Sequence, residues 1–548
     1  MTDTRPTAHR PARRHDLDMT EGSILGCLVR FALPLLVGNL FQQLYNLVDT
    51  WVIGRFGAPA EYAAVGSIGP IINVLIGFFS GLASGAGVII SHRYGARDEQ
   101  GVRRTVHTAM TLTLLLCVLF TAAGVLTTPL ILRAMLRSTA DGGVYGPAAT
   151  YLFIYFGGMS GLLIYNMAAG VLRAVGDSRR PFRYLVVASV INIVLDLVFV
   201  AWLRMGVAGV AVATVVAQLF SAVLSVSALL RSPGVVRLRL RELGIDRRIL
   251  GRIFYVGLPA ALQLAVTAFS NVFVQGYIGA IELPGFSDAT RMQVVALGAW
   301  TTYSKIDQFI FLPITSLALA VTTFVGQNLG RGKVARAKKG LLFSWLLATG
   351  VTVLLMIPVI SLAPYLSGVF SRDADMIAVA TTLLRCITPF YLFSCVNQTF
   401  AAGLRGAGRS IPPMVILLGS FVGFRQLYLW IVSTYVSRGL LPIAMSYPAG
   451  WFVCCTSMLV YYFAVGLGDG RKLAENPTAE APPADTAAPD FHPAAETRTP
   501  ACPTTAGSPP ADNAPDTRTD PPSADTPEAA KIAEAAPSPV DAPANKRA

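Results

Sequence analysis

The sequence has few charged residues for its length. Of 548 residues, 14% are Asp, Glu, Lys or Arg, against about 25% in soluble globular proteins. Hydrophobic residues make up 53% of the chain, and the mean hydropathy is +0.55. A soluble protein of this size could not cover its surface with so few charged groups. We therefore predict an integral membrane protein.

Motifs for catalysis and metal binding are also missing. The seven cysteines include no CxxC pair and no Cys/His cluster, so neither a disulfide framework nor a metal site is indicated. No Walker A loop and no nucleophile triad is visible. We predict neither enzyme activity nor a resident cofactor. The net charge of +13 does not indicate nucleic-acid binding, because the basic residues lie in short loops between apolar runs.

Twelve apolar runs alternate with polar breaks, and each is long enough to cross about 30 Å of hydrocarbon as a helix. They cover residues 28–54, 63–90, 106–128, 149–172, 184–203, 206–230, 254–280, 294–325, 341–362, 378–402, 413–436 and 443–466. The predicted fold class is an all-α integral membrane protein with twelve transmembrane helices.

Basic residues in alternate loops predict the orientation. The loops after even-numbered runs hold 22 Lys and Arg residues, and the opposite loops hold seven. Cytoplasmic loops carry the excess of Lys and Arg, so both termini are expected in the cytoplasm. Arg outnumbers Lys 37 to 7, which hints at a GC-rich bacterial genome. We therefore expect a bacterial inner-membrane location.

The two halves of the chain resemble each other. Residues 30–39 resemble 252–261 once Leu33-Pro34 is aligned with Leu258-Pro259, at an offset of 225. Residues 91–104 match 326–339 and residues 170–182 match 402–414, at offsets of 235 and 232. Each half contains six runs, an even number, so both halves cross the membrane in the same direction. This predicts two parallel six-helix repeats with a cavity between two lobes, a design that transporters use for alternating access.

These observations divide the chain into five parts. They are a basic cytoplasmic N-terminus (1–21), a first lobe (22–230), an inter-lobe loop (231–253), a second lobe (254–468) and a tail (469–548). The last 76 residues contain 16 of the 35 prolines, with 12 acidic and 5 basic residues. Such a composition cannot bury enough apolar surface to fold, so we expect a disordered cytoplasmic tail.

The first run carries a polar stripe. Asn39, Gln42, Asn46 and Asp49 are spaced by three, four and three residues, which places them on one face of a helix, with Tyr45 close to the same stripe. A stripe that ends in a carboxylate must face protein or water rather than lipid.

The fifth run repeats this arrangement with Ser189, Asn192 and Asp196. One buried aspartate could simply fix helix packing, but two on polar faces of one repeat favour a functional role. A carboxyl group in a low-dielectric site can exchange a proton, or it can hold Na⁺ with help from neutral oxygens such as those of Asn192 and Thr214. We predict a cation-coupling site for H⁺ or Na⁺ at Asp49, Asn192, Asp196 and Thr214.

The second repeat lacks these acids. Asp49 aligns with Val274, and the stretch equivalent to Asn192 and Asp196 contains Arg425. Coupling is therefore expected in the first lobe alone. Asp307 and Arg425 are assigned a structural or gating role, with Asp307 pairing to Arg425 as one hypothesis.

The ordered set of motifs resembles the multidrug and toxic compound extrusion (MATE) family over about residues 22–468. The matching segments are ALPLLVGNLFQQLYNLVDTWVIGRFG (32–57), SHRYGARD (91–98), LRAVGD (172–177) and NIVLD (192–196). The resemblance implies two six-helix bundles that form a V and couple export to entry of H⁺ or Na⁺. It is closest to the DNA-damage-inducible (DinF-type) branch.

The resemblance also implies site residues. The coupling cluster of that branch matches Asp49, Asn192, Asp196 and Thr214. The substrate cavity is expected to include Gln42, Tyr45, Asn46 and Asn166. The other large branch has acids in spans 7 and 10, where this sequence has only Glu282 at the outer end of the span and Asn397-Gln398. That departure argues against coupling in the second lobe.

The sequence thus predicts a secondary antiporter, acting as a monomer, that exports amphipathic organic cations, drugs or metabolites. Its expected partners are a small-molecule substrate and membrane lipid. A lipid-linked precursor flippase is the main alternative, although such a protein should carry more cationic residues in its cavity. A membrane enzyme or a non-transporting scaffold is a third hypothesis, for which no catalytic constellation is visible.

Overall fold

The computed structural model describes residues 17–468 apart from 136–142, 233 and 284–287. All of them belong to one compact unit, Met1–Glu480. Residues 1–16 of the basic N-terminus and the predicted tail (469–548) lie outside the described residues.

The first lobe contains the six predicted spans. Its helices are α1 (Ile24–Phe56), α2 (Pro59–Gly95), α3 (Glu99–Met135), α4 (Tyr145–Gly157), α5 (Ser160–Ala174), α6 (Arg179–Asp196), the π-helix η2 (Leu197–Trp202) and α7 (Gly206–Leu230). The pair α4 and α5 forms one span with a 47° bend. The bend follows Gly157-Gly158, where Gly158 ends α4.

The second lobe follows the same plan. Its helices are α8 (Arg247–Gly279), α9 (Ala289–Gly330), α10 (Val334–Ser361), α11 (Ala363–Phe370), α12 (Ala374–Ile387), the 3-10 helix η4 (Thr388–Phe390), α13 (Tyr391–Gly406), α14 (Ile411–Leu418), the π-helix η5 (Gly419–Phe424), α15 (Arg425–Ile431), the π-helix η6 (Val432–Val436), α16 (Leu440–Ala444) and α17 (Ser446–Val465).

The prediction of twelve spans is confirmed. Eleven described helices are long and apolar enough to cross a membrane, and the bent pair of α4 and α5 makes twelve. Among the described residues, the one β-type contact is an isolated bridge between Glu282 and Gly439. An all-helical chain is what a bilayer requires, because each helix satisfies its backbone polar groups internally.

Contacts between the lobes confirm the repeat in space. His92 Nε2 donates to the carbonyl of Gly406 at 2.7 Å, and Gln327 Nε2 donates to the carbonyl of Ala174 at 2.9 Å. His92 is equivalent to Gln327 and Gly406 to Ala174 in the aligned halves. The two bonds are therefore related by the pseudo-two-fold axis. They join the lobes at the end of the bundle that carries the most basic loops.

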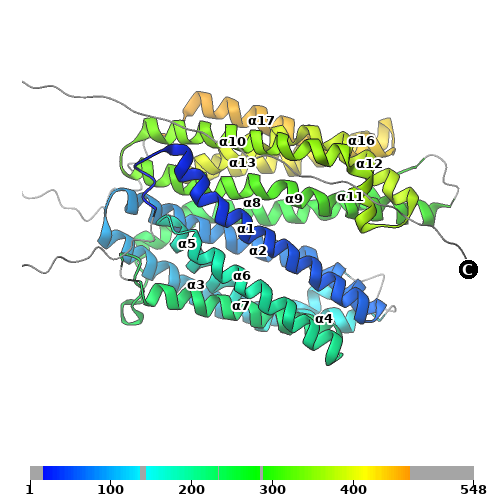
Figure 1. Ribbon diagram of the computed structural model, residues 1–548, viewed down its shortest axis with the longest axis horizontal. Coiled ribbons are helices and arrows are strands. Elements are labelled where there is room, and N and C mark those ends of the chain that lie inside the picture. The colour runs from blue at the N-terminus through cyan, green and yellow to red at the C-terminus, as the bar shows by residue number, and fades with distance from the viewer. Residues whose placement is uncertain (1–16, 136–142, 233, 284–287, 469–548) are drawn as a thin grey trace, which may run out of the picture. The chain divides into compact units, whose positions relative to one another are not determined.

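Glycines let the lobes approach at backbone distance. Helix α2 of the first lobe lies along α8 of the second (Figure 1). A Cβ at Gly85 would lie 2.3 Å from Cα of Gly257, and one at Gly81 would lie 2.4 Å from Cα of Ala261. Real Cβ atoms do not come so close, so glycine is required at both positions. Small residues at such a crossing allow dense helix packing within a bilayer.

The segment before α1 also joins the lobes. Met19 is fully buried, its N–H donates to Gln327 Oε1 at 3.1 Å, and its carbonyl accepts from Asn328 Nδ2 at 3.2 Å. Lys333 Nζ donates to the carbonyl of Thr20 at 2.8 Å. Residues 17–22 thus link the start of α1 to α9 and α10.

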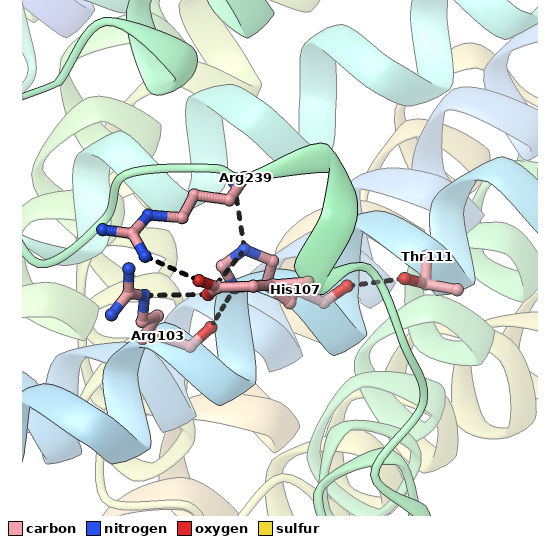
Figure 2. Close-up of polar contacts among 5 residues, drawn as sticks. Arg103, His107, Thr111 and Arg239 are labelled. Atoms are coloured by element: carbon pink, nitrogen blue, oxygen red, sulfur yellow. Dashed lines mark hydrogen bonds and ion pairs between the residues drawn. The ribbon is translucent and has the colours of Figure 1, made fainter.

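The loop between the lobes is attached to α3 by a polar network (Figure 2). His107 Nδ1 donates to the carbonyl of Arg103 at 2.7 Å, and its Nε2 accepts from the N–H of Arg239 at 3.1 Å. Glu242, on the short 3-10 helix η3 (Leu240–Glu242), pairs with Arg239 at 2.8 Å and Arg103 at 3.0 Å. The linker is therefore held against the first lobe rather than hanging between the lobes.

The glycine crossing gives a first prediction. Gly85→Ala should lower the free energy of unfolding by about 1–3 kcal/mol, because the added methyl group overpacks the contact with Gly257. Gly69→Ala on the same helix is the matched control, since nothing lies within 4 Å of its Cβ position. Thermal unfolding of the purified protein measures both. Equal melting temperatures for the two variants would contradict the close crossing.

The linker network gives a second prediction. The hydrogen bond from Arg239 and the neighbouring guanidinium of Arg103 lower the pKa of Glu242 from its ordinary value of 4.5. The carboxylate therefore stabilises the folded linker above pH 4.5, and this contribution is lost as the pH falls through the lower folded-state pKa. Glu242→Gln should increase tryptic cleavage in the linker at neutral pH.

The control for that change is Glu99→Gln at the start of α3, which should leave linker cleavage unchanged. The difference in thermal stability between the wild type and Glu242→Gln should also shrink as the pH is lowered below 4.5. A difference that stays constant with pH would show that the charge of Glu242 does not hold the linker.

Candidate functional site

A cavity of about 270 Å³ lies mainly within the first lobe, with one wall from α9 of the second. The polar face of α1 contributes Asn39, Gln42 and Tyr45. Asn39 also donates to Ser316 Oγ on α9 at 3.2 Å, which ties this face to the second lobe. The predicted polar stripe therefore faces protein and the cavity, as the cost of exposing it to lipid requires.

Asp49 of α1 and Asp196 of α6 meet beside this cavity. Their carboxyl groups are neighbours that interact electrostatically with each other. Asp196 is fully buried, and neither of its side-chain oxygens accepts a hydrogen bond from the described residues. Two neighbouring carboxylates repel each other, whereas a pair that holds one proton shares a hydrogen bond. The geometry thus suits a carboxyl pair that binds a proton.

The backbone changes at this point. Asp196 is the last residue of α6, and η2 begins at the next residue. A π-helical turn adds a residue to the helical turn and is often found at functional sites. The equivalent span of the second lobe also contains π-helical turns, η5 and η6, on either side of α15.

Asn192 and Thr214, the other two residues of the predicted coupling cluster, line the cavity. Asn192 lies one turn before Asp196, is 1% exposed, and has no hydrogen-bond partner for its amide atoms among the described residues. Thr214 on α7 donates to the carbonyl of Val210 at 3.0 Å. Both side chains line the cavity. The four residues predicted as the coupling cluster therefore come from α1, α6 and α7 to one side of the cavity.

The donor types of this cluster bear on metal binding. Carboxyl, amide and hydroxyl oxygens are ligands of hard cations. Within the part of the chain that the structure describes, no group of three or more His, Cys, Asp or Glu residues is placed to hold a metal ion. A bound Na⁺ would thus rely on neutral oxygens in addition to the two acids.

Of the four residues expected in the substrate cavity, three line the cavity described here and one does not. Gln42, Tyr45 and Asn166 line the cavity, and Asn166 is within 3.5 Å of Ser80 Oγ. Asn46 does not line it: its side chain is exposed, and its carbonyl accepts from Thr50 at 2.9 Å. At 3.6 residues per turn, Asn46 lies about 60° around the helix from Asp49, between Gln42 and Asn39, so its place on the helix does not account for its exposure.

Sequence reasoning missed several cavity and cluster residues. The ring of Tyr151 on α4 stacks on that of Tyr155, with the ring centroids 6.0 Å apart. Tyr165 and Arg173 on α5 line the cavity. The four-residue spacing of Tyr151 and Tyr155 was a visible signal of a shared face. Arg173 is one of the 22 basic residues that the charge pattern assigns to the loops after even-numbered runs.

The second lobe has a separate polar cluster around Asp307. Tyr303 and Tyr391 both donate hydrogen bonds to its carboxyl group. The hypothesis of an Asp307–Arg425 pair is wrong, because no ion pair joins these residues in the described structure. Arg425 instead donates to Ser270 Oγ at 3.1 Å and to Asn271 Oδ1 at 2.9 Å. Its guanidinium also lies 4.7 Å from the ring centroid of Tyr447.

Two lobes of six parallel-repeat spans around an internal cavity define a multi-pass membrane transporter rather than an enzyme. Among solved structures, the outward-facing conformation of a multidrug resistance MATE family transporter of the MOP superfamily has the same fold. It superposes with a TM-score of 0.75 at 23% identity, covering 83% of this chain and 98% of that one.

Curated relatives agree with that class. The probable multidrug resistance protein YpnP of Bacillus subtilis is 29% identical over 453 residues, or 81% of this chain and 96% of the relative. The probable multidrug resistance protein YoeA of the same species is 27% identical over 442 residues, or 79% and 92%. The MatE family matches residues 34–198 and 289–431. The chain belongs to the MatE family.

The Asp307 cluster gives a third prediction. Tyr391→Phe should lower the free energy of unfolding by about 1–3 kcal/mol, because it removes one hydrogen bond from a carboxyl group inside the lobe. Tyr435→Phe is the control, since that side chain is 72% exposed. Thermal unfolding measures both changes. A Tyr391→Phe variant that keeps its melting temperature would show that the tyrosine does not stabilise Asp307.

Proposed function

We propose that this protein is a secondary antiporter that exports amphipathic drugs or metabolites in exchange for protons by alternating access. The observation that carries the proposal is the Asp49–Asp196 pair, which lies close to the cavity, since Asn192, one helical turn before Asp196, lines it. The relatives named as multidrug resistance proteins support export as the direction of transport.

Proton exchange accounts for the chemistry of the pair better than a resident cation does. The two carboxyl groups have each other as neighbours and no Lys or Arg side chain bonded to them among the described residues. One proton bound between them removes their mutual repulsion, and its release restores it. Occupancy of the pair by a proton therefore changes the electrostatics next to the cavity, which gives a means of coupling.

Alternating access is supported by the position of the lobe contacts. The reciprocal bonds of His92 and Gln327 join the lobes at the end of the bundle that carries the basic loops. By the positive-inside rule that end faces the cytoplasm, and with it both termini. We propose that these contacts hold the cytoplasmic side closed in this conformation and that they separate when the cavity opens inward. A single chain supplies both lobes, so we propose a functional monomer.

The driving force is sufficient for such a pump. One proton that enters down a membrane potential of about 150 mV releases roughly 3.5 kcal/mol. That corresponds to a concentration ratio of several hundred for an exported neutral molecule, since about 1.4 kcal/mol is a factor of ten.

The fourth prediction tests the coupling. Asp49→Asn and Asp196→Asn should each abolish efflux of a fluorescent substrate from liposomes under an imposed pH gradient, while the purified variants remain folded. The amide has the shape of the carboxyl group and cannot exchange a proton at neutral pH. Asp375→Asn is the matched control, because this carboxylate pairs with Arg291 on the outside of the second lobe and is far along the chain from the cluster.

The ion is tested in the same liposomes by applying a Na⁺ gradient without a pH gradient. Efflux driven by Na⁺ alone would replace the proton with Na⁺ in the proposal. Full activity of both the Asp49→Asn and Asp196→Asn variants would refute coupling through the pair.

A further inference from the structure

The cavity contains a charge that the coupling mechanism does not use. Arg173 lies in the last turn of α5, and its side chain lines the cavity. No hydrogen bond or ion pair to its guanidinium is made by the residues that the structure describes. The group has five N–H donors and always carries a positive charge. An unpaired charge of this kind within a membrane protein is costly and marks a functional site.

The second repeat shows what a structural arginine at this place looks like. Arg405 is the equivalent of Arg173, since LRAVGD aligns with LRGAGR. Arg405 Nη1 donates to Gln263 Oε1 on α8 at 3.3 Å. The alignment of Leu33-Pro34 with Leu258-Pro259 places Gly38 of α1 at the position of Gln263. The first repeat therefore keeps the arginine and lacks the side chain that would bind it.

Position 38 lines the cavity without contributing a side chain. A Cβ at Gly38 would lie 3.3 Å from Phe182 Cδ2, so Phe182 closely covers this position. Gly38 therefore offers no side-chain group that could bind Arg173. The arginine of the second lobe is thus hydrogen-bonded to a glutamine, whereas the equivalent arginine of the first lobe faces the cavity.

The remaining walls of the cavity define what the arginine can bind. Among the described residues that line it, Arg173 is the one with a formal charge, and the polar groups beside it are neutral hydroxyls and amides such as Ser80, Thr322 and Asn39. Asp49 and Asp196 lie behind this lining and are not part of it. Leu162 and Phe182 supply apolar surface. A guanidinium in such surroundings suits a carboxylate or a phosphate, which it can bind through two parallel hydrogen bonds.

We propose that Arg173 is an anion subsite of the cavity, and that the transported molecules carry a carboxylate or phosphate group on an apolar body. The anionic group binds Arg173, and the body lies against the apolar wall toward Tyr45 and the acid pair. This proposal names the substrate class of the antiporter and so rests on the proposed function. It replaces the organic cation expected from the family resemblance, because the carboxyl groups do not line the cavity.

The fifth prediction uses three probes that share one fluorophore and differ in charge. They are dansylglycine, which is an anion, dansylamide, which is neutral, and dansylcadaverine, which is a cation. Binding to the purified full-length protein is measured at equilibrium by the change in dansyl fluorescence, with no gradient present. The wild type should bind dansylglycine about tenfold or more tightly than dansylamide, as expected for one charge-assisted contact, and dansylcadaverine most weakly.

Variants at the two arginines assign the preference to a residue. Arg173→Gln should bind dansylglycine and dansylamide equally, with the affinity for dansylamide unchanged. Arg173→Lys should retain part of the preference, because the charge remains while the two-bond geometry is lost. Arg405→Gln is the matched control from the second repeat and should keep the full preference for dansylglycine.

Three results would overturn the proposal. They are the absence of dansylglycine binding, a wild-type preference for dansylcadaverine, and a preference for dansylglycine that survives in Arg173→Gln. Because binding is measured without a gradient, these results are independent of the efflux assay. A protein that binds dansylglycine through Arg173 but shows no pH-driven efflux would retain the subsite and lose the antiport mechanism.

Discussion

The free-energy cost of a charge within a bilayer governs how the interior of this protein is arranged. Each ionisable side chain inside the spans must find a partner, share a proton or face a cavity. Asp307 accepts from two tyrosines, and Arg425 donates to Ser270 and Asn271 beneath the ring of Tyr447. Asp307 and Arg425 therefore find their partners within the second lobe. In the first lobe, Asp49 and Asp196 have each other, and Arg173 faces the cavity.

The two lobes differ in their charged groups although their backbones are related by a close pseudo-two-fold symmetry. The bonds from His92 to Gly406 and from Gln327 to Ala174 are equivalent in the two halves. The glycines follow the same rule: a Cβ at Gly95 would meet the carbonyl of Gln327, and one at Gly330 would meet that of His92. Contacts that join the lobes are thus duplicated, whereas the neighbouring carboxyl pair and the arginine that lines the cavity belong to the first lobe.

The sequence allowed the spans, the repeat and the polar faces to be predicted, because helix length and periodicity are local properties that a bilayer enforces strongly. The partners of charged residues were predicted less well. Asp307 and Arg425 were expected to pair because they are charges of opposite sign in one lobe, but tyrosines from α9 and α13 are closer to Asp307. A tyrosine hydroxyl carries no signature in a hydropathy or charge pattern.

Arg173 and Asn46 both show that position in the sequence does not determine which residues line a cavity. Arg173 was counted with the basic loop because it stands next to Asp177, Arg179 and Arg180 in sequence, yet the last turn of α5 directs it into the cavity. Asn46 has the spacing of a cavity residue and lies between Gln42 and Asn39 around the helix, yet its side chain is exposed. Spacing along the sequence predicts which face of a helix a residue occupies. Whether that residue lines a cavity depends on the neighbouring helices, which sequence periodicity does not describe.

The carboxyl pair and Arg173 of the first lobe together bear on how much the membrane potential would contribute to the proposed transport. Export of a cation in exchange for one proton moves no net charge, so the membrane potential contributes nothing to it. Export of a singly charged anion in exchange for one proton moves two charges in the favourable direction, and each releases about 2.3 kcal/mol per 100 mV. Under the proposed mechanism, a cavity whose formal charge is a guanidinium, beside a carboxyl pair that exchanges a proton, would use the membrane potential twice in each cycle. The same two groups that make the first lobe costly to fold in a membrane would make its transport strongly driven.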